Sequence, residues 1–136
     1  MKLSKDKKKN SGNFVGYIQN VNFGKYYLPA RYQYLILSDY YKKNNKIFYL
    51  PQGEPVFTKT SIRLRSIVKS LRREDNLILV SIFMLPVDSK LRNKILKDLK
   101  KKKIHIHCIF EGFVFKPNRY KAINNFFKLK SFTNSQ

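Results

Sequence analysis

The sequence predicts an α/β fold, a single three-layer domain built on a four-stranded parallel sheet. Segments of strand character alternate with amphipathic helical segments along the chain, which is typical of a parallel sheet with helices on both faces. The strongest strand segment, 77–85, is apolar almost throughout, as expected for a strand that is buried on both faces. The most economical strand order is 2-1-3-4, with right-handed crossovers.

The first half of the domain begins after a Lys-rich stretch. Residues 1–12 lack apolar periodicity, so we expect a disordered tail before a single α/β domain at 13–136. A short apolar run predicts the first strand at 14–18. Pro29 suits the first turn of a helix, where its missing N–H costs no hydrogen bond, and this helix ends at Asn44.

The middle of the chain carries the second strand and the second helix. The apolar run 47–50 predicts the strand, and the Pro- and Gly-containing segment 51–55 predicts a loop after it. Thr58 or Thr60 can cap the next helix, whose apolar residues recur at helical spacing as far as Leu71.

The last third repeats the strand–helix alternation. The strand at 77–85 ends at Pro86, and Asp88 is a good N-cap for a third helix. A fourth strand is expected at 104–110 and a last helix at 117–130.

Charge is the most conspicuous property of the composition. The chain has 29 Lys and Arg against 8 Asp and Glu, a formal net charge of +21. Such a charge attracts anionic ligands and is frequent in nucleic-acid-binding proteins, but Lys-, Asn- and Ile-rich compositions also arise from A+T-rich codons. Since 43% of the residues are hydrophobic, disorder of the whole chain is excluded.

Several features favour a cytoplasmic protein. The N-terminal residues lack the apolar region of a secretory signal, and no apolar run reaches the ~20 residues of a membrane span. A single cysteine, Cys108, excludes a disulfide within the chain and suits a reducing compartment.

Known cofactor motifs are missing. No glycine-rich phosphate loop and no cysteine pair for structural zinc occur, so we expect no cofactor and no metal. His105 and His107 would share one face of a strand with Glu111, and no other residues of the sequence come nearer to a set of metal ligands. Ordinary strand histidines are the simpler reading, and a His107–Glu111 pair would suit acid–base chemistry.

Ligands of parallel sheets bind beyond the carboxyl ends of the strands, near the point where the strand order reverses. The polar residues in the loops at this edge include Asn20, Gln52, Glu54 and Glu111. Glu54 lies between Gly and Pro, where it could bind a sugar hydroxyl, act as a base or simply face solvent. We take Glu54, His107 and Glu111 as candidate catalytic residues, and Asn20 and Gln52 as candidate ligand-binding residues.

Two rows of basic residues follow the expected helices at i, i+4, i+7 spacing. They are Arg65, Lys69 and Arg72, and Lys90, Lys94 and Lys97. Such rows are found on solvated helix faces, and also on surfaces that contact phosphates or anionic lipid headgroups.

Several short segments resemble the sporadic carbohydrate cluster proteins, small bacterial proteins encoded among genes of surface-polysaccharide synthesis. The similarity covers roughly residues 14–112. Its segments are Gly16-Tyr17-Ile18, Pro29 with Gln33, Leu35 and Asp39-Tyr40, Leu50-Pro51 with Glu54, Ser81-Ile82-Phe83-Met84-Leu85-Pro86, and His107-x-x-x-Glu111. The resemblance adds Gln33 and Ser81 as candidate ligand-binding residues. The first loop departs from it, since the Ser and Arg expected near 19–21 are absent.

The strand–helix order is also similar to the catalytic domain of serine recombinases, a Rossmann-like, resolvase-like arrangement. The positions that would carry the nucleophile and the anion-binding arginines read Gln19-Asn20-Val21 and Leu85-Pro86-Val87. The resemblance therefore concerns the fold and does not extend to recombinase activity.

Together these observations predict a cytoplasmic protein of surface-carbohydrate biosynthesis, such as that of lipopolysaccharide or capsule. It would bind or modify an activated sugar or a similar anionic small molecule, as an enzyme or as a binding protein. The alternatives are a basic nucleic-acid-binding protein and a non-enzymatic partner of a glycosyltransferase, and a homodimer is compatible with each.

Overall fold

The computed structural model describes residues 12–19, 28–49, 52–53 and 62–134, with side chains omitted at 52–53 and 130–134. The expected tail lies outside these residues except for Gly12, and so do the expected helix caps Thr58 and Thr60.

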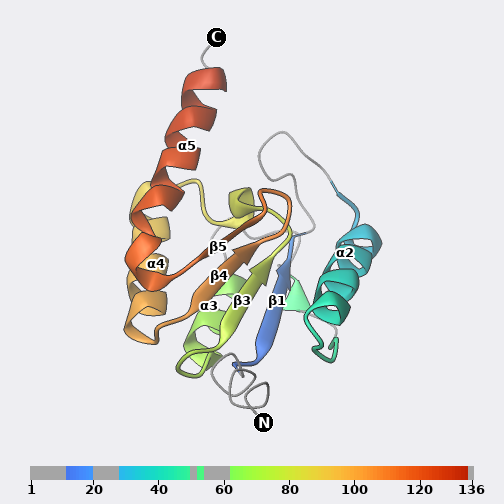
Figure 1. The fold of residues 1–136 in the computed structure, drawn as a ribbon. Helices are drawn as coiled ribbons and strands as arrows, with labels where there is room; N and C mark the ends of the chain where they lie inside the picture. The colour runs from blue at the N-terminus through green and yellow to red at the C-terminus, as the bar shows by residue number, and fades with distance from the viewer. Residues whose placement is uncertain (1–11, 20–27, 50–51, 54–61, 135–136) are drawn as a thin grey trace.

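A mixed sheet forms the centre of the described structure (Figure 1). The strand order across it is β2-β1-β3-β4-β5, in which β1 pairs in parallel with both β2 and β3, and β3 with β4. The fifth strand is antiparallel to β4. The strands are β1 (Phe14–Ile18), β2 (Gln52–Gly53), β3 (Asn76–Leu79), β4 (His105–Cys108) and β5 (Phe113–Phe115).

Within the described residues, three helices connect the parallel strands, and a fourth helix follows β5. They are α2 (Ala30–Lys43), α3 (Ile62–Ser70), α4 (Ser89–Lys101) and α5 (Lys121–Asn134), with the short 3₁₀ segments η1 (Ile82–Met84) and η2 (Pro117–Arg119). The start of α4 follows the sequence prediction, because the Asp88 carboxylate accepts a hydrogen bond from the backbone N–H of Leu91 at 3.0 Å.

The helices divide between the two faces of the sheet. Phe14 of β1 contacts both Tyr41 of α2 and His107 of β4, so α2 lies on the face to which His107 points. Phe113 and Phe115 flank Val114, which pairs with His107, and they therefore point to the opposite face. Phe126 of α5 packs on both of these rings, and Figure 1 shows α2 apart from α4 and α5.

The core consists of apolar side chains between the sheet and these helices. Leu77, Ile78 and Leu79 of β3 are completely buried, as expected for the central strand of a doubly covered sheet. No helix within the described part of the chain has the length and apolar character needed to cross a membrane.

The prediction of a sheet with four parallel strands is incomplete, because a fifth, antiparallel strand follows β4 at the edge of the sheet. Gly112 adopts φ +73°, a left-handed conformation that glycine accepts without strain. The chain therefore turns back after β4, with the Gly112 N–H bonded to the Cys108 carbonyl at 2.9 Å, and β5 pairs with β4.

Two other strands differ from the expectation. Residues 47–49 are irregular, and the pairing with β1 occurs at Gln52–Gly53 instead. The long strand expected at 77–85 ends at Leu79, because Ser81 begins a 3₁₀ turn by accepting a hydrogen bond from the Phe83 N–H at 3.2 Å.

Candidate functional site

Ser81 and Glu111 meet at the carboxyl edge of the sheet, as expected for residues that follow adjacent parallel strands. The Ser81 hydroxyl donates to Glu111 Oε2 at 2.8 Å, and the Ile82 N–H donates to Glu111 Oε1 at 2.8 Å. Both carboxylate oxygens thus accept hydrogen bonds from the start of η1. These bonds connect the segment after β3 with the segment after β4. Ser81 itself is 1% exposed.

Gln33 of α2 ties the end of β1 to that helix. Its Oε1 accepts from the Gln19 N–H at 3.1 Å, and its Nε2 donates to the carbonyls of Gln19 and Leu28, each at 2.6 Å. Gln19 extends the connection by donating to the Met84 carbonyl. Because Gln33 is completely buried, these bonds give it a structural role, and its contact with a ligand stays a prediction.

The remaining loop candidates have less structural description. Asn20 and Glu54 lie outside the described residues, and Gln52 is described only as backbone, in β2 beside Tyr17. The roles expected for these three residues stay predictions.

His107 is the centre of a hydrogen-bonded chain under α2. Its Nδ1 lies 2.6 Å from the Tyr40 hydroxyl, and its Nε2 lies 2.9 Å from Asn76 Oδ1. The Asn76 amide nitrogen donates to the Gly12 carbonyl at 3.1 Å, which fixes the orientation of that amide. Since Oδ1 only accepts, Nε2 carries the imidazole proton, and the Tyr40 hydroxyl donates to Nδ1.

The surroundings of His107 keep its imidazole neutral at neutral pH. Burial, and to a smaller degree the nearby His105, lower its pKa from 6.5 to about 4. Burial also raises the pKa of the Tyr40 hydroxyl, so this phenol stays protonated and remains a donor. The hydrogen bonds between Tyr40, His107 and Asn76 therefore join uncharged groups. The rings of Tyr40 and His107 both pack against the Phe14 ring.

The expected His107–Glu111 pair is absent. The ring nitrogens of His107 bond to Tyr40 and Asn76, whereas the carboxylate of Glu111 bonds to Ser81 and Ile82. The prediction was wrong because it assumed that His107 and Glu111 lie on one face of a single strand. The strand ends at Cys108, and the chain turns at Glu111–Gly112. Among the described residues, no three His, Cys, Asp or Glu side chains are placed to hold a metal ion.

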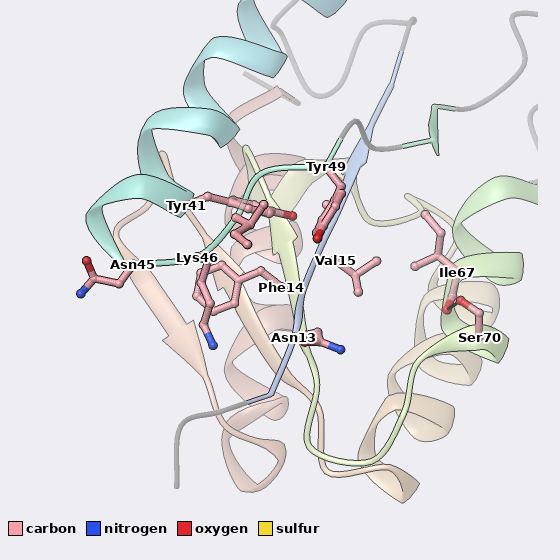
Figure 2. Close-up of a pocket in the computed structure, with 11 residues that line it drawn as sticks. Asn13, Phe14, Val15, Tyr41, Asn45, Lys46, Tyr49, Ile67 and Ser70 are labelled. Carbon is pink, nitrogen blue, oxygen red and sulfur yellow. Dashed lines mark hydrogen bonds between the residues drawn. The ribbon is translucent and has the colours of Figure 1, made fainter. Parts of the chain in front are cut away.

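A hollow of about 690 Å³ lies beside β1, on the side where β2 pairs only with Tyr17 and Ile18 (Figure 2). Its size is within the ~300–1,000 Å³ range of small-molecule sites. The segment after α2 forms one wall, β1 the floor and α3 the other wall. The described lining residues are Asn13, Phe14, Val15, Gly16, Tyr41, Asn45, Lys46, Ile47, Tyr49, Ile67 and Ser70.

The lining of this hollow combines cationic, aromatic and hydrogen-bonding groups. Lys46 Nζ lies 5.3 Å from the centre of the Phe14 ring and donates to the Gly12 carbonyl at 3.2 Å. Tyr49 is 72% exposed, so its ring is accessible to a ligand. None of the described lining residues is acidic. The described lining of the hollow therefore offers a polar ligand one positive charge and no carboxylate.

Sequence reasoning did not single out this hollow. Lys46, Tyr49 and Asn13 are adjacent to no motif, and their common location depends on the packing of α2 and α3 against β1. Helical spacing gives no indication of the bond between Tyr40 and His107, because it does not reveal a partner 67 positions away.

No protein-family model matches this chain, and no significant similarity was found to a curated protein or to a solved structure.

Proposed function

We propose that the protein binds an anionic small molecule, with an activated sugar as the ligand class, in the hollow beside β1. The observation that carries this proposal is the combination, in one hollow of about 690 Å³, of Lys46 with the aromatic ring of Tyr49 and no described acidic residue. A lysine ammonium suits a phosphate group, and an exposed tyrosine ring suits the face of a sugar or a base.

The amide and hydroxyl groups in the lining support a hydroxyl-rich ligand. Asn13, Asn45 and Ser70 contribute donors and acceptors from both walls and from the floor. The resemblance to the sporadic carbohydrate cluster proteins supplies the activated-sugar class, and with it a cytoplasmic role in surface-carbohydrate synthesis. The wider positive charge of the chain would speed the arrival of such an anion at low salt.

Binding, rather than a defined reaction, is the activity that these residues support. The described lining carries no carboxylate, and the neutral His107 points to Tyr40 and Asn76. We propose a Rossmann-like relationship for the sheet, in which the hollow is a site different from the usual one. It lies along the amino-terminal half of β1, at residues 13–16, whereas ligands of such sheets usually bind beyond the carboxyl ends of the strands.

The test is isothermal titration calorimetry with UDP-glucose, free UDP and glucose. We expect saturable binding of UDP-glucose, weaker binding of UDP, and at least a tenfold loss of affinity in Lys46→Gln, because a charge-assisted hydrogen bond contributes about 1.5–3 kcal/mol. Tyr49→Ala should also weaken binding.

Matched controls separate the hollow from the overall charge. Lys42→Gln removes the same charge from an exposed position on α2, and Tyr32→Ala removes a partly exposed ring from that helix. Both should bind like the wild type. Absence of saturable binding, or equal losses in the Lys46 and Lys42 variants, would refute the proposal.

A further inference from the structure

The outer faces of α3 and α4 carry an exposed basic surface that is separate from the hollow. Its members are exposed Lys and Arg side chains that recur at three- or four-residue spacing along α3 with the turn after it and along α4. They are Arg65, Lys69, Arg72, Lys90, Lys94, Lys97 and Lys101. We call this set the α3–α4 basic surface.

A lysine clamp holds the two helices side by side. Lys102, the C-cap of α4, directs its ammonium to the last turn of α3, where it donates to the carbonyls of Val68 at 2.8 Å and Lys69 at 2.9 Å. The clamp satisfies carbonyls that the helix itself leaves unpaired, and it complements the negative end of the helix dipole. The C-terminal ends of α3 and α4 therefore lie together, and their basic rows run next to each other.

The spacing within the rows follows from helix geometry. On α4, Lys90, Lys94, Lys97 and Lys101 are separated by four, three and four positions and share one face. At about 1.5 Å per residue this row is roughly 16 Å long, the axial length of about five phosphates on one strand of duplex DNA. The axes of packed helices usually lie roughly 8–10 Å apart, so the row on α3 is expected to lie close to the row on α4.

The surface has almost no opposing charge. The sequence of α3 contains no acidic residue, and that of α4 contains only Asp98, which is half-buried. Within the part of the chain that is described, the one ion pair joins Lys43 and Asp39 of α2. Among the described residues, none of the side chains of the α3–α4 basic surface forms an ion pair with a carboxylate, so their charges are available to a polyanion.

We propose that the α3–α4 basic surface binds the phosphate backbone of double-stranded nucleic acid without sequence preference. Neither helix contains an aromatic residue, so the surface offers no stacking platform for single-stranded bases. The one large apolar side chain exposed on the two helices is Ile62, whereas membrane-surface helices present a full apolar face. Lysine ammonium groups contact phosphates as point charges, which positions a duplex but does not read its bases.

The experiment measures fluorescence anisotropy of a labelled 20-base-pair duplex at several salt concentrations. The test variant combines Lys69→Gln, Lys94→Gln and Lys97→Gln. The control variant combines Arg31→Gln, Lys42→Gln and Lys43→Gln on α2, on the opposite face of the sheet, and removes the same charge. Glutamine is a good helix former, so both variants should keep the wild-type circular dichroism spectrum.

We expect the test variant to lower the slope of log affinity against log salt by about 2.7, because each phosphate contact contributes about 0.9. The control should keep the wild-type slope. Acetylation mapped by mass spectrometry supplies a measurement on the wild type alone, in which duplex should protect Lys69, Lys94 and Lys97 but not Lys42.

Three outcomes would overturn the proposal. Equal slope changes in the two variants would assign the binding to net charge alone. Tighter binding of a single strand of the same length than of the duplex would contradict the proposed preference for double-stranded nucleic acid. Binding to phosphatidylserine vesicles in the absence of any duplex binding would identify a lipid surface instead.

Discussion

The Tyr40 hydroxyl donates a hydrogen bond of 2.6 Å to Nδ1 of His107, and this bond joins α2 to the fourth strand of the sheet. His107 is 8% exposed, so solvent has little access to Nδ1 as a replacement partner. The bond therefore contributes to the attachment of α2 as well as to the orientation of the imidazole.

Tyr40→Phe should lower the free energy of unfolding by about 1 kcal/mol, because it leaves the buried Nδ1 without a donor while keeping the ring contact with Phe14. Urea unfolding followed by circular dichroism measures this change. The matched control is Tyr32→Phe, which removes a more exposed hydroxyl from the same helix and should leave stability unchanged. Equal effects of the two changes would show that the Tyr40–His107 bond contributes no stability.

The depressed pKa of His107 makes stability depend on pH. In the unfolded chain the imidazole binds a proton below its ordinary pKa of 6.5, whereas in the folded protein it does so only near 4. Between these values the unfolded state binds more protons, so stability should fall as the pH falls from 6.5 toward 4, by about 3 kcal/mol in total.

Comparison with a variant isolates this contribution from that of the carboxylates. In His107→Phe the fall in unfolding free energy between pH 7 and pH 4 should be smaller than in the wild type by about 3 kcal/mol. A histidine NMR titration gives the pKa directly. An imidazole of His107 that titrates near 6.5 in the folded protein would contradict the prediction.

Removal of the Glu111 carboxylate should weaken the turn after β3. Glu111→Ala leaves the Ser81 hydroxyl and the completely buried Ile82 amide without their acceptor, and should cost about 2 kcal/mol in urea unfolding. Glu111→Gln keeps one oxygen acceptor and should cost less. Asp39→Ala is a suitable control, because it removes an exposed carboxylate whose ion pair with Lys43 contributes at most about 0.5 kcal/mol.

Arg92 is the polar residue on which the packing of α4 against α5 depends. Its guanidinium donates to the carbonyls of Pro86 and Val87 and to Asn124, and lies 4.0 Å from the centre of the Phe127 ring. Burial lowers its pKa, but the group remains charged at neutral pH because the usual value is 12.5.

Arg92→Met should reduce the unfolding free energy by about 2 kcal/mol, because it leaves these acceptors unpaired, and Arg92→Lys should lie between it and the wild type. The change is measured by thermal and urea unfolding. Lys94→Met, on the exposed side of the same helix, should stay within about 0.5 kcal/mol of the wild type. If Arg92→Lys were as stable as the wild type, the positive charge alone, and not the planar guanidinium group, would be required.

Local signals predicted several elements well. The strand at 14–18 coincides with β1, the helix before Asn44 coincides with α2, and Asp88 caps α4. In each case the determinant lies within a few residues: an apolar run, a proline immediately before the first helical residue, or a carboxylate three positions before the amide from which it accepts a hydrogen bond. Such signals do not depend on the rest of the fold.

The sequence by itself therefore determined the alternation of strands and helices, the buried character of the central strand and the excess of positive charge. Only the tertiary structure decided that His107 bonds to Tyr40 rather than to Glu111, that β5 returns along β4, and that Lys46 and Tyr49 share a hollow with β1. The physical reason is the range of the interactions. Periodicity and capping act over a few positions, whereas these contacts join residues that only the folded chain brings together.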